Sequence, residues 1–142
     1  MALRFTFILI IITWTGFLFG QNNDSKTKNC VLQLWGEDTT VYNVVDSMPE
    51  FPGSNDSTFS FIAKNLDHNK YKSLNGVINI HFFVETDGSL TNFFAGDTSI
   101  MGDNEQAFIA AVDVLKKMPK WNPGKCNGRK VRVFFSLPFQ FP

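Results

Sequence analysis

The sequence predicts an α+β fold in which an antiparallel three-stranded sheet carries two helices packed on one face. Segments with apolar residues at every second position predict half-buried strands, and segments with apolar residues three and four positions apart predict amphipathic helices. The chain has 142 residues, 44% of them hydrophobic, which is enough for one domain with its own core. We divide it into residues 1–20, 21–39 and 40–142.

Residues 1–20 have the pattern of an export signal. Arg4 precedes an apolar run from Phe5 to Phe19, and after Gly20 the chain becomes polar. The run is about 15 residues long, shorter than the ~20 that a membrane-spanning helix needs. We expect a signal peptide cleaved after Gly20, with a short uncleaved signal anchor as the alternative.

Residues 21–39 predict a polar leader with one short strand. Gln21–Asn29 is polar and has no hydrophobic period, whereas Cys30–Trp35 has leucines at alternate positions. An exported chain meets an oxidising compartment, in which Cys30 and Cys126 either form a disulfide or remain two free thiols. The sequence leaves both alternatives open, because it does not show that the two Cα atoms come close enough.

Two segments have the spacing of helices. After a β-prone stretch at Thr40–Val45, a first helix is predicted at Asn55–Leu66. A second is predicted to open at Asp103, whose side chain can cap the first turn, and to end before Pro119. Each helix has one apolar stripe, formed by Phe59, Ile62, Ala63 and Leu66 in the first and by Phe108, Ala111, Val112 and Leu115 in the second.

Three segments have the pattern of strands. From Gly76 to Val84 every second residue is apolar, Asp87-Gly88 then predicts a tight hairpin turn, and Leu90–Ala95 predicts the return strand. The last strand is predicted at Lys130–Phe139, with one wholly apolar face. Three strands that each have one apolar face need helices on that face alone, which gives the predicted architecture.

The composition argues against several classes of function. The formal net charge is zero, whereas domains that bind nucleic acids usually carry an excess of basic residues. We therefore expect no nucleic-acid partner. His68 and His81 are separated and no acidic or cysteine ligands cluster with either, so we expect no metal site. The sequence has no paired nucleophile and base and no phosphate-binding loop, so we expect neither an enzyme nor a cofactor.

Three segments follow one another in a fixed order: Gly76–Gly88, the end of the second helix with Lys117–Lys125, and Asn127–Val133. This order resembles the C-terminal domain of TonB-family energy transducers. The resemblance covers residues 40–142, and the lead-in Val41–Gly53 is similar to Bacteroidetes-type members. The matching residues, to which the resemblance gives structural roles, are Pro49, Phe51, Pro52, Gly53, Gly76, Asp87, Gly88, Pro119, Trp121, Pro123, Gly124 and Gly128.

The resemblance implies a periplasmic protein-binding domain that docks outer-membrane receptors by β-strand addition, in energy-dependent transmembrane transport. The partner is then an outer-membrane receptor or transporter, or another envelope protein, and a homodimer is a further expectation. The inner membrane is a partner only if the N-terminal segment stays uncleaved and anchors the chain there. The alternative is a secreted or periplasmic adaptor or structural subunit without energy coupling, which the lack of a long Pro-rich linker favours.

We place the partner-binding surface on the last strand, which we expect at the edge of the sheet with its main chain open for pairing. Phe134 points away from the core face, either toward a partner or into a cluster with Phe83. Arg132 either meets an acidic partner or is a solubilising charge, and Trp121 either recognises a partner or fixes a loop onto the core. The residues assigned to the partner-binding edge are Lys130, Val131, Arg132, Val133, Phe134, Phe135, Ser136 and Leu137.

Overall fold

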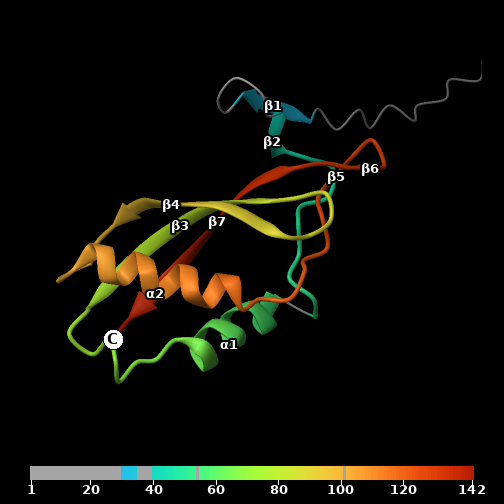
Figure 1. Cartoon of the computed structure of the whole chain (residues 1–142). Coiled ribbons are helices and arrows are strands. Elements are labelled where there is room, and N and C mark those ends of the chain that lie inside the picture. Colours follow the sequence, from blue (N-terminus) through green and yellow to red (C-terminus); the bar gives the residue numbers. More distant parts are fainter. Residues whose placement is uncertain (1–29, 35–39, 54, 101) are drawn as a thin grey trace, which may run out of the picture.

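The computed structural model describes residues 30–34, 40–53, 55–100 and 102–142 of the chain (Figure 1). The predicted signal peptide, at residues 1–20, and residues 21–29 of the predicted leader lie outside the described residues. Among the described residues, no helix is both long enough and apolar enough to cross a membrane.

The described chain is an α+β domain with two helices and a mixed five-stranded sheet, so the prediction of a purely antiparallel three-stranded sheet is wrong (Figure 1). The strand order is β1-β2-β7-β3-β4, and β5 and β6 form a separate hairpin. The elements are β1 Val31–Leu34, β2 Thr40–Val44, α1 Asn55–Asn65, β3 Gly76–Val84, β4 Leu90–Thr98, α2 Asn104–Lys116, β5 Lys125–Cys126, β6 Arg129–Lys130 and β7 Val133–Phe141.

The three predicted strands form the centre of this sheet. β3 pairs antiparallel with β4 on one side and with β7 on the other, and the β3–β7 pairing runs without a break from Gly76↔Phe141 to Val84↔Val133. The two further strands are β1 and β2, which form an antiparallel pair, and β2 pairs parallel with β7. The parallel pair makes the sheet mixed.

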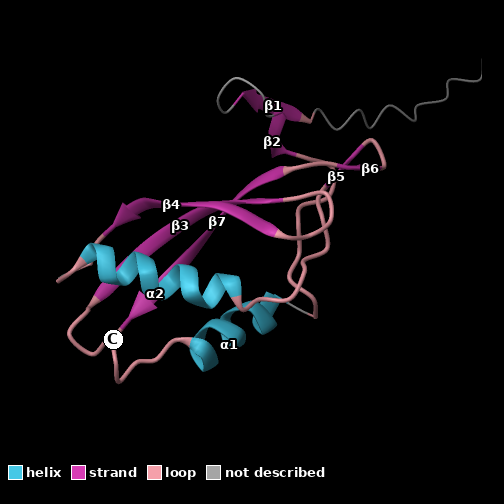
Figure 2. Ribbon diagram, viewed as in Figure 1, coloured by secondary structure: helices cyan, strands magenta, loops and turns pink. Residues whose placement is uncertain are grey.

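Both helices pack on the same face of the central strands (Figure 2). The core contains the alternating residues of β3 and β7, among which Phe82, Phe139 and Phe141 are fully buried. The Asp103 side chain accepts hydrogen bonds from the backbone N–H groups of Glu105 and Gln106, and thereby caps α2 where the sequence predicts.

The buried stripe of α1 differs from the predicted one. Ile62 and Leu66 are buried as expected, but Phe59 and Ala63 are exposed and Thr58 is buried instead. Helix α1 is therefore rotated so that one edge of its apolar stripe faces away from the core. The exposed edge lies beside β7, where it becomes part of the candidate site described below.

The predicted last strand is divided in two. Lys130 belongs to β6 and pairs with Lys125 across the short β5–β6 hairpin. Asn127 and Gly128 form the turn, with φ values of 50° and 75°, which is the conformation that Asn-Gly favours in two-residue hairpins. The long strand begins only at Val133, because the chain must first leave the hairpin.

Candidate partner-binding edge

The strand order corrects the prediction that residues 130–137 border the sheet for the first part of this segment, up to Val133. β7 lies between β2 and β3, and Val133 pairs with Tyr42 on one side and with Val84 on the other. The Tyr42 N–H donates to the Arg132 carbonyl at 2.9 Å, and the Val131 N–H donates to the Gly124 carbonyl at 3.0 Å. The main chain from Lys130 to Val133 is therefore already paired and offers no open edge.

Beyond Val133, β7 has a strand on one side only within the described part of the chain. The β2 pairing consists of the single register pair Tyr42↔Val133, whereas the β3 pairing continues to Phe141. Main-chain groups along a strand alternate between its two neighbours. The Arg132 carbonyl points toward β2, and Ser136 and Gln140 are separated from Arg132 by an even number of residues. The N–H and C=O groups of Ser136 and Gln140 therefore point to the same side, away from β3. The open edge therefore covers the second half of β7, from Ser136 to Gln140.

Pro138 lies in the middle of this open stretch. Proline has no N–H to donate and occurs in sheets at positions whose donor faces outward. Pro138 is two residues from Ser136 and from Gln140, so its backbone nitrogen points to the same open side. The lack of an N–H there leaves the β3 pairing intact. The presence of proline in a long, well-paired strand is consistent with this half of β7 being a sheet edge.

Two hollows lie along the open edge and share Phe59 and Pro138. The larger, of about 410 Å³, lies between α1 and the end of β7, and its lining is mostly apolar. The smaller, of about 330 Å³, extends toward the start of β7 and includes Phe51, Trp121 and Leu137. Together they form a groove beside the open main chain of β7, which we call the β7 groove.

Arg132 is held within the protein and is not left for a partner. Its Nε lies 2.9 Å from Glu85 Oε1, a contact that is an ion pair without the alignment of a hydrogen bond. Its guanidinium lies 4.6 Å from the centre of the Phe83 ring, and the Thr91 hydroxyl donates to Glu85. The positive charge of Arg132 is therefore matched on the sheet face that carries no helix.

Phe134 joins an aromatic cluster on this helix-free face. Its ring centre lies 6.4 Å from that of Phe83, 6.1 Å from that of Phe94 and 5.2 Å from that of His81. The sequence left two interpretations of Phe134 open, and the structure supports the one in which Phe134 clusters with Phe83. Phe83 itself is only 3% exposed.

Several of the motif residues meet at one end of the sheet. The Trp121 ring packs against Phe51, Phe82 and Phe135 with ring centres 5.2 to 5.9 Å apart, and Trp121 is buried. Trp121 thus fixes its loop onto the core. A Cβ on Gly124 would lie 2.5 Å from Val133 Cγ2 and 3.2 Å from Pro49 Cδ, so glycine lets the lead-in and β7 approach each other here.

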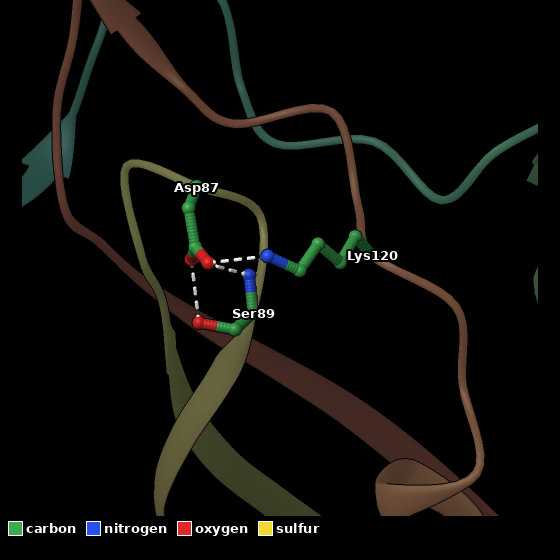
Figure 3. A network of polar contacts seen from close by, with 3 residues as sticks. All are labelled: Asp87, Ser89 and Lys120. Carbon is green, nitrogen blue, oxygen red and sulfur yellow. Dashed lines mark hydrogen bonds and ion pairs between the residues drawn. The ribbon is translucent and has the colours of Figure 1, made fainter.

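The Asp87-Gly88 turn is bound to the same loop. The Trp121 N–H donates to the Gly88 carbonyl at 2.9 Å, and Lys120 Nζ donates to Asp87 Oδ2 at 2.6 Å (Figure 3). Ser89 donates to the other carboxylate oxygen of Asp87 from both its N–H and its hydroxyl. The Lys120 ammonium, with these Ser89 donors, holds the pKa of the Asp87 carboxyl well below its usual range.

The remaining motif residues lie elsewhere. Gly76 begins β3 at the opposite end of the sheet, and Gly128 is at the tip of the β5–β6 hairpin. Pro52 and Gly53 precede α1, while Pro119 and Pro123 flank the Trp121 loop. These residues shape turns and are not brought together into a site.

Cys30 and Cys126 form a disulfide with Cα atoms 6.1 Å apart. The bond joins the start of β1 to β5, and the Asn127 N–H donates to Asp46 Oδ2 beside it at 2.6 Å. Cys30, Asp46 and Cys126 are the group of three potential metal ligands found among the described residues, but a disulfide leaves no thiolate to bind a cation.

Sequence reasoning missed the wall of the β7 groove. Phe59 was placed in the core because its spacing from Ile62 and Leu66 fits a buried stripe, yet it is 55% exposed. The spacing of a stripe does not show how far the stripe is rotated toward the core. A usable signal was Pro138, which marks an open strand edge in the sequence itself.

Comparison of the chain with known proteins identifies a similarity to one solved structure. No protein-family model and no curated protein matches the chain. Among solved structures, the chain is similar to the NMR structure of the TonB C-terminal domain of Helicobacter pylori, with a TM-score of 0.39 and 15% sequence identity. The match covers 64% of this chain and 87% of that domain.

Proposed function

We propose that the chain is a periplasmic, TonB-like protein-binding module that docks outer-membrane receptors by accepting a receptor segment as an extra strand along β7. The observation that carries this proposal is the open edge from Ser136 to Gln140, which lies beside the β7 groove. Unpaired main-chain donors and acceptors beside an apolar groove are what β-strand addition requires. The binding edge is thus shifted toward the C-terminus from the one predicted from the sequence.

The link to receptors and to energy-dependent transport is supported by the sequence motifs that resemble TonB-family domains. The role of an exported protein is also supported by the Cys30–Cys126 disulfide, because disulfides persist in oxidising compartments such as the periplasm. Cell fractionation tests the location. Recovery of the protein in the cytoplasmic fraction would contradict a periplasmic role.

A proline substitution tests the recognition mode. Ser136→Pro removes a donor that faces the open edge and leaves the β3 pairing intact, whereas proline at Val133 would break the paired centre of the sheet. We expect the wild-type chain to recover an outer-membrane receptor from envelope extracts and Ser136→Pro to lose it. Ser136→Ala is the matched control, because it keeps the backbone N–H and should bind like the wild type. An unchanged set of captured proteins with Ser136→Pro would contradict strand addition at this edge.

A further inference from the structure

The wall that faces the open edge of β7 is apolar and solvent-accessible. It is formed by α1, and Phe59 is its largest exposed side chain. The larger hollow is lined by the polar residues His68 and Gln140 and by the apolar residues Phe59, Ile62, Ala63, Leu66, Val77 and Pro138. No Asp, Glu, Lys or Arg is among its described lining residues. A side chain that enters this hollow meets no carboxylate, ammonium or guanidinium group among the described lining residues.

We propose that the β7 groove selects extended segments of a partner protein in which every second side chain is apolar. This inference rests on the proposed strand addition, since only an added strand fixes which of the partner's side chains face α1. It goes further by naming the chemistry of the segment. Open main chain on one wall favours an extended partner, and the uncharged wall opposite favours apolar side chains.

The periodicity of a strand gives the spacing. Successive side chains of an added strand point to opposite faces, so every second one points toward the helices and the others toward the helix-free face. One hollow extends along β7 from Pro138 toward Gln140 and the other from Pro138 toward Phe135. Side chains two residues apart on a strand are separated by roughly 6.6 Å, so consecutive helix-facing side chains of the partner can occupy the two hollows.

Charge strengthens the selection. A carboxylate that pointed toward α1 would lose part of its hydration against a mostly apolar wall without meeting a Lys or Arg, which is unfavourable. The smaller hollow carries Glu50, which would also repel an acidic side chain. On the helix-free side, the added residues would lie beside Ser136 and Gln140, which are exposed and polar and which also line the smaller and the larger hollow respectively. The preferred segment therefore alternates apolar and polar residues.

Two synthetic heptapeptides test this preference with the full chain. One has Ile at positions 2, 4 and 6 and Ser elsewhere, and the other has Asp in place of each Ile. We expect the Ile peptide to bind at least roughly tenfold more tightly in a fluorescence-anisotropy titration, because the Asp peptide must bury charge. Equal affinities, or no binding of the Ile peptide, would overturn the inference.

A matched pair of α1 variants locates the preference. Ala63→Glu puts a carboxylate on the wall of the groove, and Ser60→Glu makes the same charge change at an exposed position of α1 that lines neither hollow. We expect Ala63→Glu to lower the affinity of the chain for the Ile peptide by roughly tenfold, and Ser60→Glu to leave this affinity unchanged. An equal response of the two variants would overturn the assignment to the groove.

Ser136→Pro separates this inference from the proposed function. If both peptides bind equally well and Ser136→Pro weakens both, strand addition holds and the apolar preference fails. If Ser136→Pro changes neither affinity, strand addition itself fails. Sedimentation of the full chain tests the other occupant of the groove. A dimer that Ala63→Glu converts to a monomer would place a second copy of the chain there and overturn a heterologous partner.

Discussion

Gly88 and Gly128 have similar left-handed backbone conformations but different surroundings. Their φ values are 84° and 75°, so a residue with a side chain would be strained at either position. A Cβ on Gly88 would collide with the Trp121 carbonyl oxygen, whereas a Cβ on Gly128 would meet nothing within 4 Å. At the scale of single residues, the first glycine is fixed by a tertiary contact and the second only by its turn.

Replacement of each glycine by alanine separates these two effects. We expect Gly128→Ala to lower the free energy of unfolding by about 1–2 kcal/mol, through backbone strain alone. Gly88→Ala should lower the free energy of unfolding by about 1–3 kcal/mol more than Gly128→Ala does, because the Trp121 loop must move away from the turn. Urea denaturation of both variants gives the difference. Equal losses would show that the contact between Gly88 and the Trp121 loop does not stabilise the fold.

Asp87 gives the stability a predictable dependence on pH. Its pKa is lowered in the folded state, chiefly by the Lys120 ammonium and then by Ser89. The stabilisation is therefore complete above the unfolded-state pKa of about 4 and is lost as the pH falls toward the lower folded-state value. We expect Asp87→Asn to flatten the decline in unfolding free energy below pH ~4.

Salt is the matched control for Asp87, because both side chains of the Asp87–Lys120 pair are more than half exposed. Raising the ionic strength should weaken the contribution of the wild-type pair and leave Asp87→Asn unaffected. An acid transition with the same slope in both proteins would mean that other carboxyl groups set the acid stability.

At the scale of elements, β1 and β2 form an arm that is joined to the rest of the sheet by one short strand pairing. β2 meets β7 through the single register pair Tyr42↔Val133, and an isolated two-stranded hairpin is marginally stable in water. The Cys30–Cys126 disulfide joins the start of this arm to β5, across a sequence separation of 96 residues. Figure 1 shows the arm at the far end of β7 from the helices.

We expect that loss of the disulfide releases this arm without unfolding the central strands. In a Cys30→Ser/Cys126→Ser variant, amide hydrogen exchange should rise sharply in Thr40–Val44 and change little in Gly76–Val84, which is paired on both sides. Hydrogen exchange followed by mass spectrometry checks this. Equal loss of protection in both segments would show that the disulfide stabilises the whole fold, at up to ~4.7 kcal/mol in the chain-entropy model.

At the scale of the whole molecule, two phenylalanines of the described chain, Phe82 and Phe59, have opposite surroundings. Phe82 is fully buried and contacts Phe93, Trp121 and Phe135 in the core. Phe59 is more than half exposed and lines both hollows of the β7 groove. Phe82 therefore stabilises the core, whereas Phe59 leaves most of its ring accessible in the β7 groove.

Two alanine substitutions test this division. Phe82→Ala should lower the free energy of unfolding by about 3–5 kcal/mol, because it leaves a cavity in the core. Phe59→Ala should change stability by less than about 1 kcal/mol but weaken binding of the Ile peptide. Thermal denaturation and the anisotropy titration measure the two effects. A large loss of stability in Phe59→Ala would show that this side chain supports the core after all.

The sequence alone determined the local structure of this protein. Alternating apolar residues placed β3 and the core side of β7, and the apolar spacing placed both helices. Asp103 marked a helix cap and Asp87-Gly88 marked a turn. These features depend on neighbours within a few residues, so their pattern is visible in the chain. The structural importance of Trp121 was also accessible, because a large aromatic side chain beside prolines commonly fixes a loop.

Only the tertiary structure decided which main-chain groups remain open. The β1–β2 arm pairs with the start of β7 and closes the edge that the sequence had suggested, while the second half of β7 stays open beside α1. The rotation of α1, which exposes Phe59, could not be predicted from the sequence pattern either. Strand order and helix rotation result from contacts between residues far apart in the chain, and local periodicity carries no information about those contacts.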